Sequence, residues 1–398
     1  MTHDITAPQR RALWALSLAY FIQATGALSV AGSLTPISLE WGLTDGQSAR
    51  LLAIFGLTFA LGAPLAQVAF GHLPRRRQVL TGLGVFGLGA LLFALSPGYP
   101  LLVTARIIMG LGAALIGPVL VALGSELVKQ QARGSAIAMI LLGVSLASMV
   151  GIPLAAWVAN LWGARALFAI VGAFSLLAAY NVRLSVPDTV PGSPVRLRQV
   201  AETLASGKLL AAFLVIFFIT AGVFDVYSFI SPIVRDSYHG DANAVSIALA
   251  IIGIAGIIGN IFVSRAARRY SAEQLLVAGI TLLMADMLVI MALPGPLGLL
   301  YIALIFWAFA TDILWPTQQR RIVEITSPQQ RGIALALTSA FMFCGIGFGS
   351  AVASWVYPTL GFYGVMGSAL LFLALAVLSL WLSERLRAVT LRRCAAGA

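Results

Sequence analysis

The chain has 398 residues, of which 60% are hydrophobic and 10% are charged, and its formal net charge is +11. A soluble domain carries about 25% charged residues, so this chain has too few polar side chains to cover a surface that faces water. The composition therefore excludes an ordinary soluble domain and predicts an all-α integral membrane protein. The basic residues fall in short clusters between apolar segments and form no single patch, which argues against nucleic acid as a partner.

Twelve apolar segments are long enough to cross a membrane. A helix needs about 20 such residues to span the ~30 Å of hydrocarbon in a bilayer. The first segment is too long for the core of a signal peptide, so we expect it to be retained as a span. In chain order the predicted spans are 13–37, 49–71, 78–96, 100–124, 135–160, 165–186, 208–233, 244–264, 274–293, 297–319, 333–357 and 361–383.

The distribution of basic residues predicts the orientation. With both termini in the cytoplasm, 21 of the 25 Lys and Arg lie in cytoplasmic segments, three lie in outer loops, and Arg106 lies within a span. This asymmetry follows the positive-inside rule and requires an even number of crossings of the cell (inner) membrane. The longest inner connector divides the chain. We predict an N-terminal six-helix bundle (1–186), a cytosolic linker (187–207) and a C-terminal six-helix bundle with a basic cytosolic tail (208–398).

The two halves of the chain share landmarks. A shift of 198 positions places several residues of the first half on identical residues of the second. Two halves of one design, related by an axis along the membrane normal and enclosing a site near the midplane, are typical of one class of transporters. The matching pairs are Pro118 and Pro316, Glu126 and Glu324, Arg133 and Arg331, Gly151 and Gly349, Trp157 and Trp355, and Gly163 and Gly361.

Motifs for catalysis or cofactor binding are missing from the sequence. Cys344 and Cys394 make no disulfide framework, and the three histidines are scattered and form no metal site. The string "GLGVFG" (82–87) matches a dinucleotide-binding pattern, but it lies inside an apolar span with no strand before it. No P-loop is present. We therefore expect neither an enzyme nor a bound metal or cofactor.

Three strings carry a family resemblance. They are "FGLTFALGAPLAQVAFGHLPRRRQVL" (55–80), "ARIIMGLGAA" (105–114) and "GVSLASMVGIPLAAWVANLWGARALF" (143–168). They resemble the second, fourth and fifth spans of major facilitator superfamily transporters, within the drug:proton antiporter family and its arabinose, sugar and purine-nucleoside efflux permease branch. The resemblance implies twelve helices in two bundles around a central cavity.

The same resemblance implies a function. Members of this branch export sugars, nucleosides or drugs in exchange for protons, so the proton motive force replaces a cofactor. The implied partners are a small-molecule substrate, protons and the lipid bilayer, and we expect a monomer. The sequence departs from the branch in two ways: the loop "GHLPRRR" lacks the usual acid, and the first span has no acid near Ala27. A coupling carboxylate must therefore lie elsewhere.

Four ionisable side chains lie well inside the predicted spans. Each costs about 2.5–3.5 kcal/mol at a helix centre, so such residues normally face the bundle interior or a wet cavity. Asp312 in span ten and Asp225 in span seven are the candidates for proton coupling, because burial favours the neutral form of a carboxyl group. Asp286 lies in span nine, which the family fold places at the periphery. We expect it to be turned inward and satisfied by a hydrogen bond.

Arg106 has two possible roles. It is predicted to be a cavity charge held by backbone carbonyls or by the substrate. A weaker alternative pairs it with Asp225 across the two halves to close the outer gate.

Neutral polar and aromatic residues in the spans are candidates for substrate binding. At helical spacing such side chains equally often bind neighbouring helices. The candidates are Gln23, Thr25, Tyr227, Asn260, Trp307, Thr311 and Trp315.

Four charged residues at cytoplasmic helix ends are candidate latches of the inner gate. The alternative is that they form surface pairs worth under about 1 kcal/mol. They are Glu126, Arg133, Glu324 and Arg331.

The sequence thus predicts a secondary active transporter that exports a small molecule by proton-coupled alternating access. A uniporter or importer of a small polar solute without proton coupling stays open, because the first span lacks an acid. A membrane receptor or structural protein without transport activity is a second alternative. The polar residues near mid-depth argue against it, since an idle scaffold has no use for them.

Overall fold

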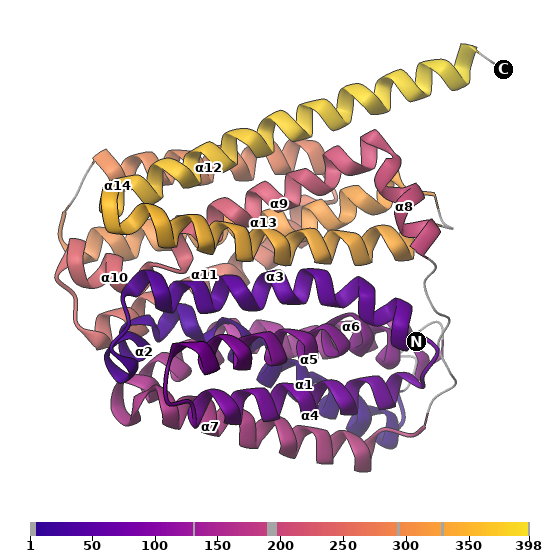
Figure 1. Ribbon diagram of the computed structural model, residues 1–398. Helices are drawn as coiled ribbons and strands as arrows, with labels where there is room; N and C mark the ends of the chain where they lie inside the picture. The colour runs from indigo at the N-terminus through magenta and orange to yellow at the C-terminus, as the bar shows by residue number, and fades with distance from the viewer. Residues whose placement is uncertain (1–4, 130–131, 189–196, 293–294, 328–329, 397–398) are drawn as a thin grey trace.

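The computed structural model describes residues 5–129, 132–188, 197–292, 295–327 and 330–396. Its regular structure within these ranges is helical, and Figure 1 shows long helices lying side by side in two groups, one from each half of the chain. Both chain termini lie at the same end of the bundle (Figure 1). We call this the termini end and the opposite end the far end.

The first half contains seven α-helices and one π-helical segment in the described ranges. Most are apolar around much of their circumference, as expected for helices packed between protein and lipid. Their bounds are α1 (Ala7–Gly32), α2 (Leu34–Trp41), α3 (Asp45–Phe70), α4 (Arg75–Ala94), α5 (Tyr99–Glu126), α6 (Arg133–Leu146), the π-helix η2 (Ala147–Gly151) and α7 (Ile152–Ser185).

The second half follows the same plan after a short helix, α8, in the connector. The sequence analysis did not predict α8, which lies inside the segment expected to be a linker. The bounds are α8 (Leu197–Ala205), α9 (Gly207–Tyr227), α10 (Ile230–Pro232), the π-helix η3 (Ile233–Ser237), α11 (Ala242–Ala266), α12 (Ala272–Ala292), α13 (Leu297–Ile325) and α14 (Arg331–Ala396).

The helices account for twelve crossings. Ten segments of the described chain are long and apolar enough to span a membrane, and two of them, Ser135–Ser185 and Ile333–Ala388, are about twice the length of one crossing. Each contains one glycine with non-helical backbone angles: Gly163, at φ 84°, and Gly361, at φ 58°. Figure 1 shows α14 reversing direction. The prediction of twelve spans is therefore confirmed.

Gly163 and Gly361 are also a pair that the shift of 198 positions matches. Both have positive φ values, which glycine adopts without the steric penalty of a Cβ atom. The sequence repeat is thus a structural repeat at this turn. The boundaries of the two bundles at 186 and 208 stay a prediction, because residues 189–196 of the linker lie outside the described ranges.

Glycines bring the two halves into close contact. A Cβ atom on Gly56 of α3 would lie 2.9 Å from the backbone nitrogen of Gly347 in α14. A Cβ atom on Gly253 of α11 would meet the backbone of Ser148 and Met149 in η2. Small residues of this kind let helix backbones approach each other in a membrane. These two close helix contacts, α3 with α14 and α11 with η2, flank the space between the halves.

Candidate functional site

A cavity of about 320 Å³ lies between the two halves. The first half contributes residues of α1, α6 and η2 and the start of α7, and the second half contributes residues of α9, α11 and α13. The π-helix η2 forms part of the wall through Ala147 and Ser148. Single π-turns inside helices occur frequently at functional sites. The cavity is therefore the candidate binding site.

Asp312 lines this cavity near the middle of α13. It lies 15 residues after Leu297 and 13 before Ile325, the two ends of α13. Its Oδ1 accepts a hydrogen bond of 2.9 Å from Asn260 Nδ2 of α11. One turn earlier in the same helix, a Cβ atom on Gly256 would overlap Asp312 Oδ2. The carboxyl group thus fits in a space that only a glycine at position 256 leaves free.

Two parallel aromatic pairs form the wall beside Asp312. Tyr227 stacks on Trp307 at 6.1 Å between ring centroids, and Phe224 stacks on Trp315 at 6.4 Å. Thr311 lines the same wall, and its hydroxyl donates to the Trp307 carbonyl at 2.8 Å. The structure thus brings together five of the predicted substrate contacts with Asp312: Tyr227, Asn260, Trp307, Thr311 and Trp315.

The indole N–H groups of Trp307 and Trp315 have no hydrogen-bond partner among the described residues. Buried indole N–H groups usually have one. The two indole nitrogens are themselves buried, so the ligand-facing chemistry is the Asp312 carboxyl group beside aromatic faces, which suits a ligand that combines a ring with an amine or hydroxyl group.

The cavity is covered at the far end and reaches the surface toward the termini end. Tyr227 and Trp307, on the far-end side, are only 7% and 3% exposed. Gln319, seven residues after Asp312 toward the termini end, lines the cavity and is exposed. The cavity is therefore accessible from the termini end.

A cluster around Arg235 closes the far end, and we call it the Arg235 network. Arg235 Nη2 donates to Asp45 Oδ2 of the first half at 2.7 Å, and Nη1 donates to Thr35 Oγ1 at 3.0 Å. Within its own half, Arg235 Nε donates to Asp236 at 2.6 Å, and the Tyr357 hydroxyl donates to the same carboxylate at 2.8 Å. Arg235 therefore connects the two halves.

Two further contacts support this closure. Thr35 and Ser231 share a hydrogen bond of 3.0 Å, and Arg50 Nε donates to Ser354 at 3.4 Å. Four hydrogen bonds between described residues join the halves, and all four are at the far end. The sequence analysis missed this network because it counted Arg50 and Arg235 only as outer-loop charges. Asp45 and Asp236 lie at the outer ends of spans, and these acids were the sequence signal that could have indicated the network.

The contact between Arg235 and Asp236 favours the charged form of both side chains. The hydrogen bond from Arg235 lowers the pKa of Asp236 below its usual value, and the same bond raises the pKa of Arg235. Both groups are therefore charged at every physiological pH.

Arg106 lies in the core of the first half, away from the cavity. It is fully buried, and it donates to the carbonyls of Leu51 at 3.0 Å, Gly26 at 3.2 Å and Ala27 at 2.9 Å. Its guanidinium also lies 4.6 Å from the Phe55 ring centroid. The prediction of a charge held by backbone carbonyls agrees with these contacts. The alternatives of a substrate contact or a pair with Asp225 do not, because Arg106 is fully buried in the first half, does not line the cavity, and makes its described contacts within that half.

These contacts predict a structural role for Arg106. Replacing it with Ala removes three hydrogen bonds from a charged donor and leaves a space between α1, α3 and α5. We expect a loss of about 3–5 kcal/mol of stability, because each hydrogen bond from a charged group contributes about 1.5–3 kcal/mol and the removal of a buried charge offsets part of their sum. Thermal unfolding of the purified protein in detergent measures this. Arg198→Ala is the control, because Arg198 is 88% exposed in its side chain and forms an exposed ion pair with Glu202, so the unfolding temperature of this variant should stay unchanged.

Asp225 is also turned away from the cavity. It is fully buried in α9, and Ser368 of α14 donates to its Oδ2 at 2.5 Å, while Oδ1 has no partner among the described residues. Gln23 and Thr25 are likewise buried between helices, and the cavity wall from α1 consists of Ala24 and Leu28 instead. Consecutive residues of a helix point about 100° apart, so only some of Gln23, Ala24 and Thr25 can face the cavity. The apolar pattern of the sequence did not show which of them do.

Two of the four predicted latch residues, Glu126 and Glu324, form ion pairs within their own half. Glu126 is 3.0 Å from Arg75, and Glu324 is 2.6 Å from Arg320 one turn away. Arg133 and Arg331 are exposed at the starts of α6 and α14. In this state the cavity is open toward the termini end, and the four residues do not bridge the halves within the described chain. Their role as latches in the opposite state stays a prediction.

A buried charge cluster at the termini end was not predicted. Arg321 of α13 is fully buried, and its Nη2 donates to Glu384 at 2.7 Å and to Ser383 at 2.8 Å. Glu273 of α12 lies 3.5 Å from Arg321 and 3.3 Å from Arg387. The cluster ties three helices of the second half together. The sequence analysis assigned Arg321 and Arg387 to the cytoplasmic charge excess and assigned no role to the two glutamates.

The arrangement of two helical bundles around an inter-bundle cavity is that of a membrane transporter. The sequence profile of the Major Facilitator Superfamily matches residues 16–296 and 209–393. The chain belongs to this superfamily. It is therefore a multi-pass membrane protein of a transporter family and not an enzyme, as the sequence analysis predicted.

Several proteins of the superfamily are similar to this chain in sequence. The MFS-type transporter YbcL of Bacillus subtilis (strain 168) is 26% identical over 85% of this chain and 87% of its own length. The inner membrane transport protein YdhP of Escherichia coli (strain K12) is 25% identical over 94% of this chain and 96% of its own. A chloramphenicol resistance protein of Streptomyces lividans is 28% identical over 72% of this chain and 74% of its own.

Solved structures share the fold. A bacterial homologue of the human lysosomal transporter Spinster, in an inward-facing and unoccupied conformation, aligns with a TM-score of 0.77 and 15% identity over 98% of this chain and 99% of that chain. A D-xylose-proton symporter aligns with a TM-score of 0.74 and 15% identity over 92% of this chain and 97% of that chain. At this level of identity the likeness concerns the fold alone.

Proposed function

We propose that the protein exports a small drug-like molecule from the cytoplasm in exchange for protons, with Asp312 as the coupling group. The observation that carries the proposal is the position of Asp312: it lines the inter-bundle cavity near mid-depth and is held by Asn260. Burying a carboxyl group at that depth costs free energy, so its presence there indicates a function. The termini end is taken as cytoplasmic, as the distribution of basic residues predicts, and the location as the cell (inner) membrane.

In this scheme the two bundles rock about the cavity. Substrate enters from the cytoplasmic side while the Arg235 network keeps the outer side closed. Binding of a substrate beside Asp312 favours the carboxylate, and a proton taken up from outside displaces the substrate after the bundles rock. Moving one proton down 100 mV supplies about 2.3 kcal/mol, which supports a gradient of roughly 40-fold. The energy source is thus the proton motive force.

The wall chemistry favours an aromatic or amine-bearing substrate over a sugar. The side chains around Asp312 are mostly aromatic and aliphatic, whereas a sugar needs many hydrogen-bonding groups. The similarity to the chloramphenicol resistance protein agrees with a drug-like substrate. Sugars and nucleosides should be tested beside drug-like molecules as the competing classes of candidate substrate.

Proton release tests this proposal against transport without coupling. Candidate substrates are added to weakly buffered purified protein, and pH is followed with an indicator dye. An exporter of the proposed kind releases a proton from native protein at a pH where Asp312 is protonated, and the Asp312→Asn variant releases none. Binding without proton release would favour a uniporter or importer. No binding across the panel would favour a protein without transport activity.

The contact between Gly256 and Asp312 gives a further prediction. Gly256→Ala adds a methyl group where Asp312 Oδ2 lies, so the carboxyl group that Asn260 holds must shift from its place in the cavity wall. We expect substrate affinity and transport to fall by about tenfold or more, which corresponds to about 1.4 kcal/mol. Transport into vesicles measures this. Gly84→Ala is the control, because a Cβ at that position in α4 would meet no atom within 4 Å from the rest of the described chain outside its own helical turn, and it should transport normally.

A further inference from the structure

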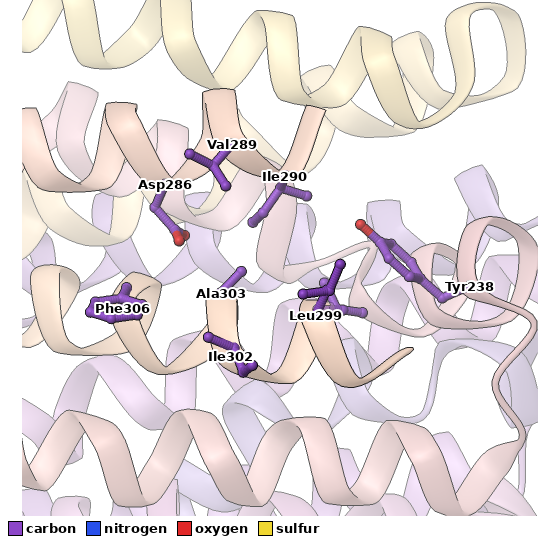
Figure 2. A pocket seen from close by; sticks show the side chains of 9 residues that line it. Tyr238, Asp286, Val289, Ile290, Leu299, Ile302, Ala303 and Phe306 are labelled. Atoms are coloured by element: carbon purple, nitrogen blue, oxygen red, sulfur yellow. The ribbon is translucent and has the colours of Figure 1, made fainter. Parts of the chain in front are cut away.

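A second pocket lies on the outer surface of the second half, between α12 and α13. It has a volume of about 140 Å³, and Figure 2 shows its lining side chains. Asp286 of α12 and Tyr238, just after η3, are its polar members, and the others are apolar. The mechanism proposed above makes no use of this pocket.

Asp286 is the unusual member. Its side chain is 7% exposed, and its Oδ2 has no hydrogen-bond partner among the described residues. The sequence analysis expected an inward hydrogen bond, and the described part of the chain supplies none to this oxygen. Figure 2 shows the carboxyl group pointing across the pocket toward Ala303 and Phe306 of α13. A buried oxygen without a partner costs about 1–3 kcal/mol, and more if charged, so a ligand that offsets the charge of the carboxyl group from within the pocket is favoured.

The pocket opens toward lipid. Four of its side chains are about half exposed in the isolated chain: Val289 (53%), Leu299 (45%), Ile302 (54%) and Phe306 (49%). In a membrane-spanning bundle these apolar side chains face acyl chains. Asp286 lies six residues before Ala292, the far-end terminus of α12, or about 9 Å along the helix. A molecule dissolved in that part of the bilayer therefore reaches Asp286 without entering the central cavity.

The size and chemistry of the pocket define its ligand. A cavity of about 150 Å³ with aliphatic and aromatic walls holds a benzene ring. A carboxylate at one side of such a space takes a cation, and a protonated amine supplies both the charge and the hydrogen-bond donor. We propose that this pocket binds a lipid-soluble primary amine, with the ammonium on Asp286 and a benzene-sized group against Ala303 and Phe306.

This site is distinct from the cavity of the proposed exporter. Its ligand enters from the bilayer, and its carboxylate belongs to α12, whereas Asp312 belongs to α13 and lines the space between the halves. The inference therefore stands whether or not Asp312 couples transport to protons.

Chemical labelling of Asp286 tests the proposal. The full-length protein in lipid nanodiscs is treated with dicyclohexylcarbodiimide, a membrane-soluble reagent that modifies protonated carboxyl groups, and labelling of Asp286 is followed by peptide mass spectrometry. Benzylammonium at saturation should slow this labelling about tenfold, because it occupies the pocket and keeps Asp286 ionised. Benzyl alcohol, which has the same ring without the charge, should have little effect. Asp312→Asn should leave the protection unchanged.

The Ala303→Leu variant provides a second arm. The larger side chain fills the pocket without altering any charge, so benzylammonium should no longer change the labelling rate of Asp286. Equal protection by benzylammonium and benzyl alcohol would overturn the proposal, because it would mean that the pocket takes any small ring. Absence of protection in the native protein, or full protection in Ala303→Leu, would also overturn it.

Discussion

Replacing Asp312 with Asn should abolish transport driven by a pH gradient while substrate exchange across the membrane continues. The amide keeps the shape of the side chain and one acceptor for Asn260, which lies 2.9 Å away, but it cannot take up or release a proton. Binding therefore persists, and coupling is lost. Uptake into inverted vesicles with an acidic interior, compared with counterflow between equal pH values, measures the two activities separately.

Asp225→Asn is the matched control for this experiment. Both residues are membrane-embedded aspartates of the second half, but Asp225 binds Ser368 in the packing between α9 and α14 and does not line the cavity. We expect the Asp225→Asn variant to keep pH-driven uptake. Normal uptake by the Asp312→Asn variant would exclude Asp312 as the coupling group. Loss of uptake in the Asp225→Asn variant alone would move coupling to α9.

Replacing Arg235 with Ala should shift the protein toward a state with an open far end. The substitution removes the hydrogen bonds to Asp45 and Thr35, two of the four that join the halves in the described chain. The side chain of Arg235 is 38% exposed, so we expect a modest change of about 1–2 kcal/mol, or about 5–30-fold in the ratio of open to closed molecules. The Arg235 network stabilises only the present state, in which the far end is closed. Its loss therefore favours the state in which the far end is open.

Distances between spin labels measure this shift. Leu39 of α2 and Tyr363 of α14 are 80% and 54% exposed at the far end and belong to different halves, so they suit labelling after Cys344 and Cys394 are changed to Ser. The longer distance should become more populated in Arg235→Ala. Arg165→Ala is the control, because Arg165 pairs with Glu40 at the same end but within the first half. An equal shift in both variants would contradict the gate assignment.

The far-end closure should not respond to pH in the physiological range. The pKa of Asp236 is lowered by its hydrogen bond from Arg235, so its contribution is present above the usual pKa of Asp and is lost only as pH falls through the lowered value. The label distance should therefore stay constant between about pH 5 and 8 in the absence of substrate. A change in that range would mean that another group titrates within the gate. Any pH dependence of transport is then expected from the membrane-embedded acids.

The sequence by itself determined the number and order of the membrane-spanning segments. Length and hydropathy define a membrane span because the hydrocarbon core sets a minimum of apolar residues, and the predicted span 49–71 differs from Asp45–Phe70 by only a few residues. The repeat also located both hairpin glycines, Gly163 and Gly361, because a positive φ restricts the residue type. Asp312 was identified as a candidate because an acid in a span is rare.

Only the tertiary structure decided which polar residues meet. Arg106 and Asp225 have the same signature in the sequence as Asp312, a charge inside an apolar segment, yet their partners are backbone carbonyls and Ser368. The Arg235 network joins residues about 190 positions apart, and no periodicity within one helix encodes that contact. Hydropathy sets how deep a residue lies in the membrane, whereas the rotation of each helix and the contact between the two bundles decide what it faces.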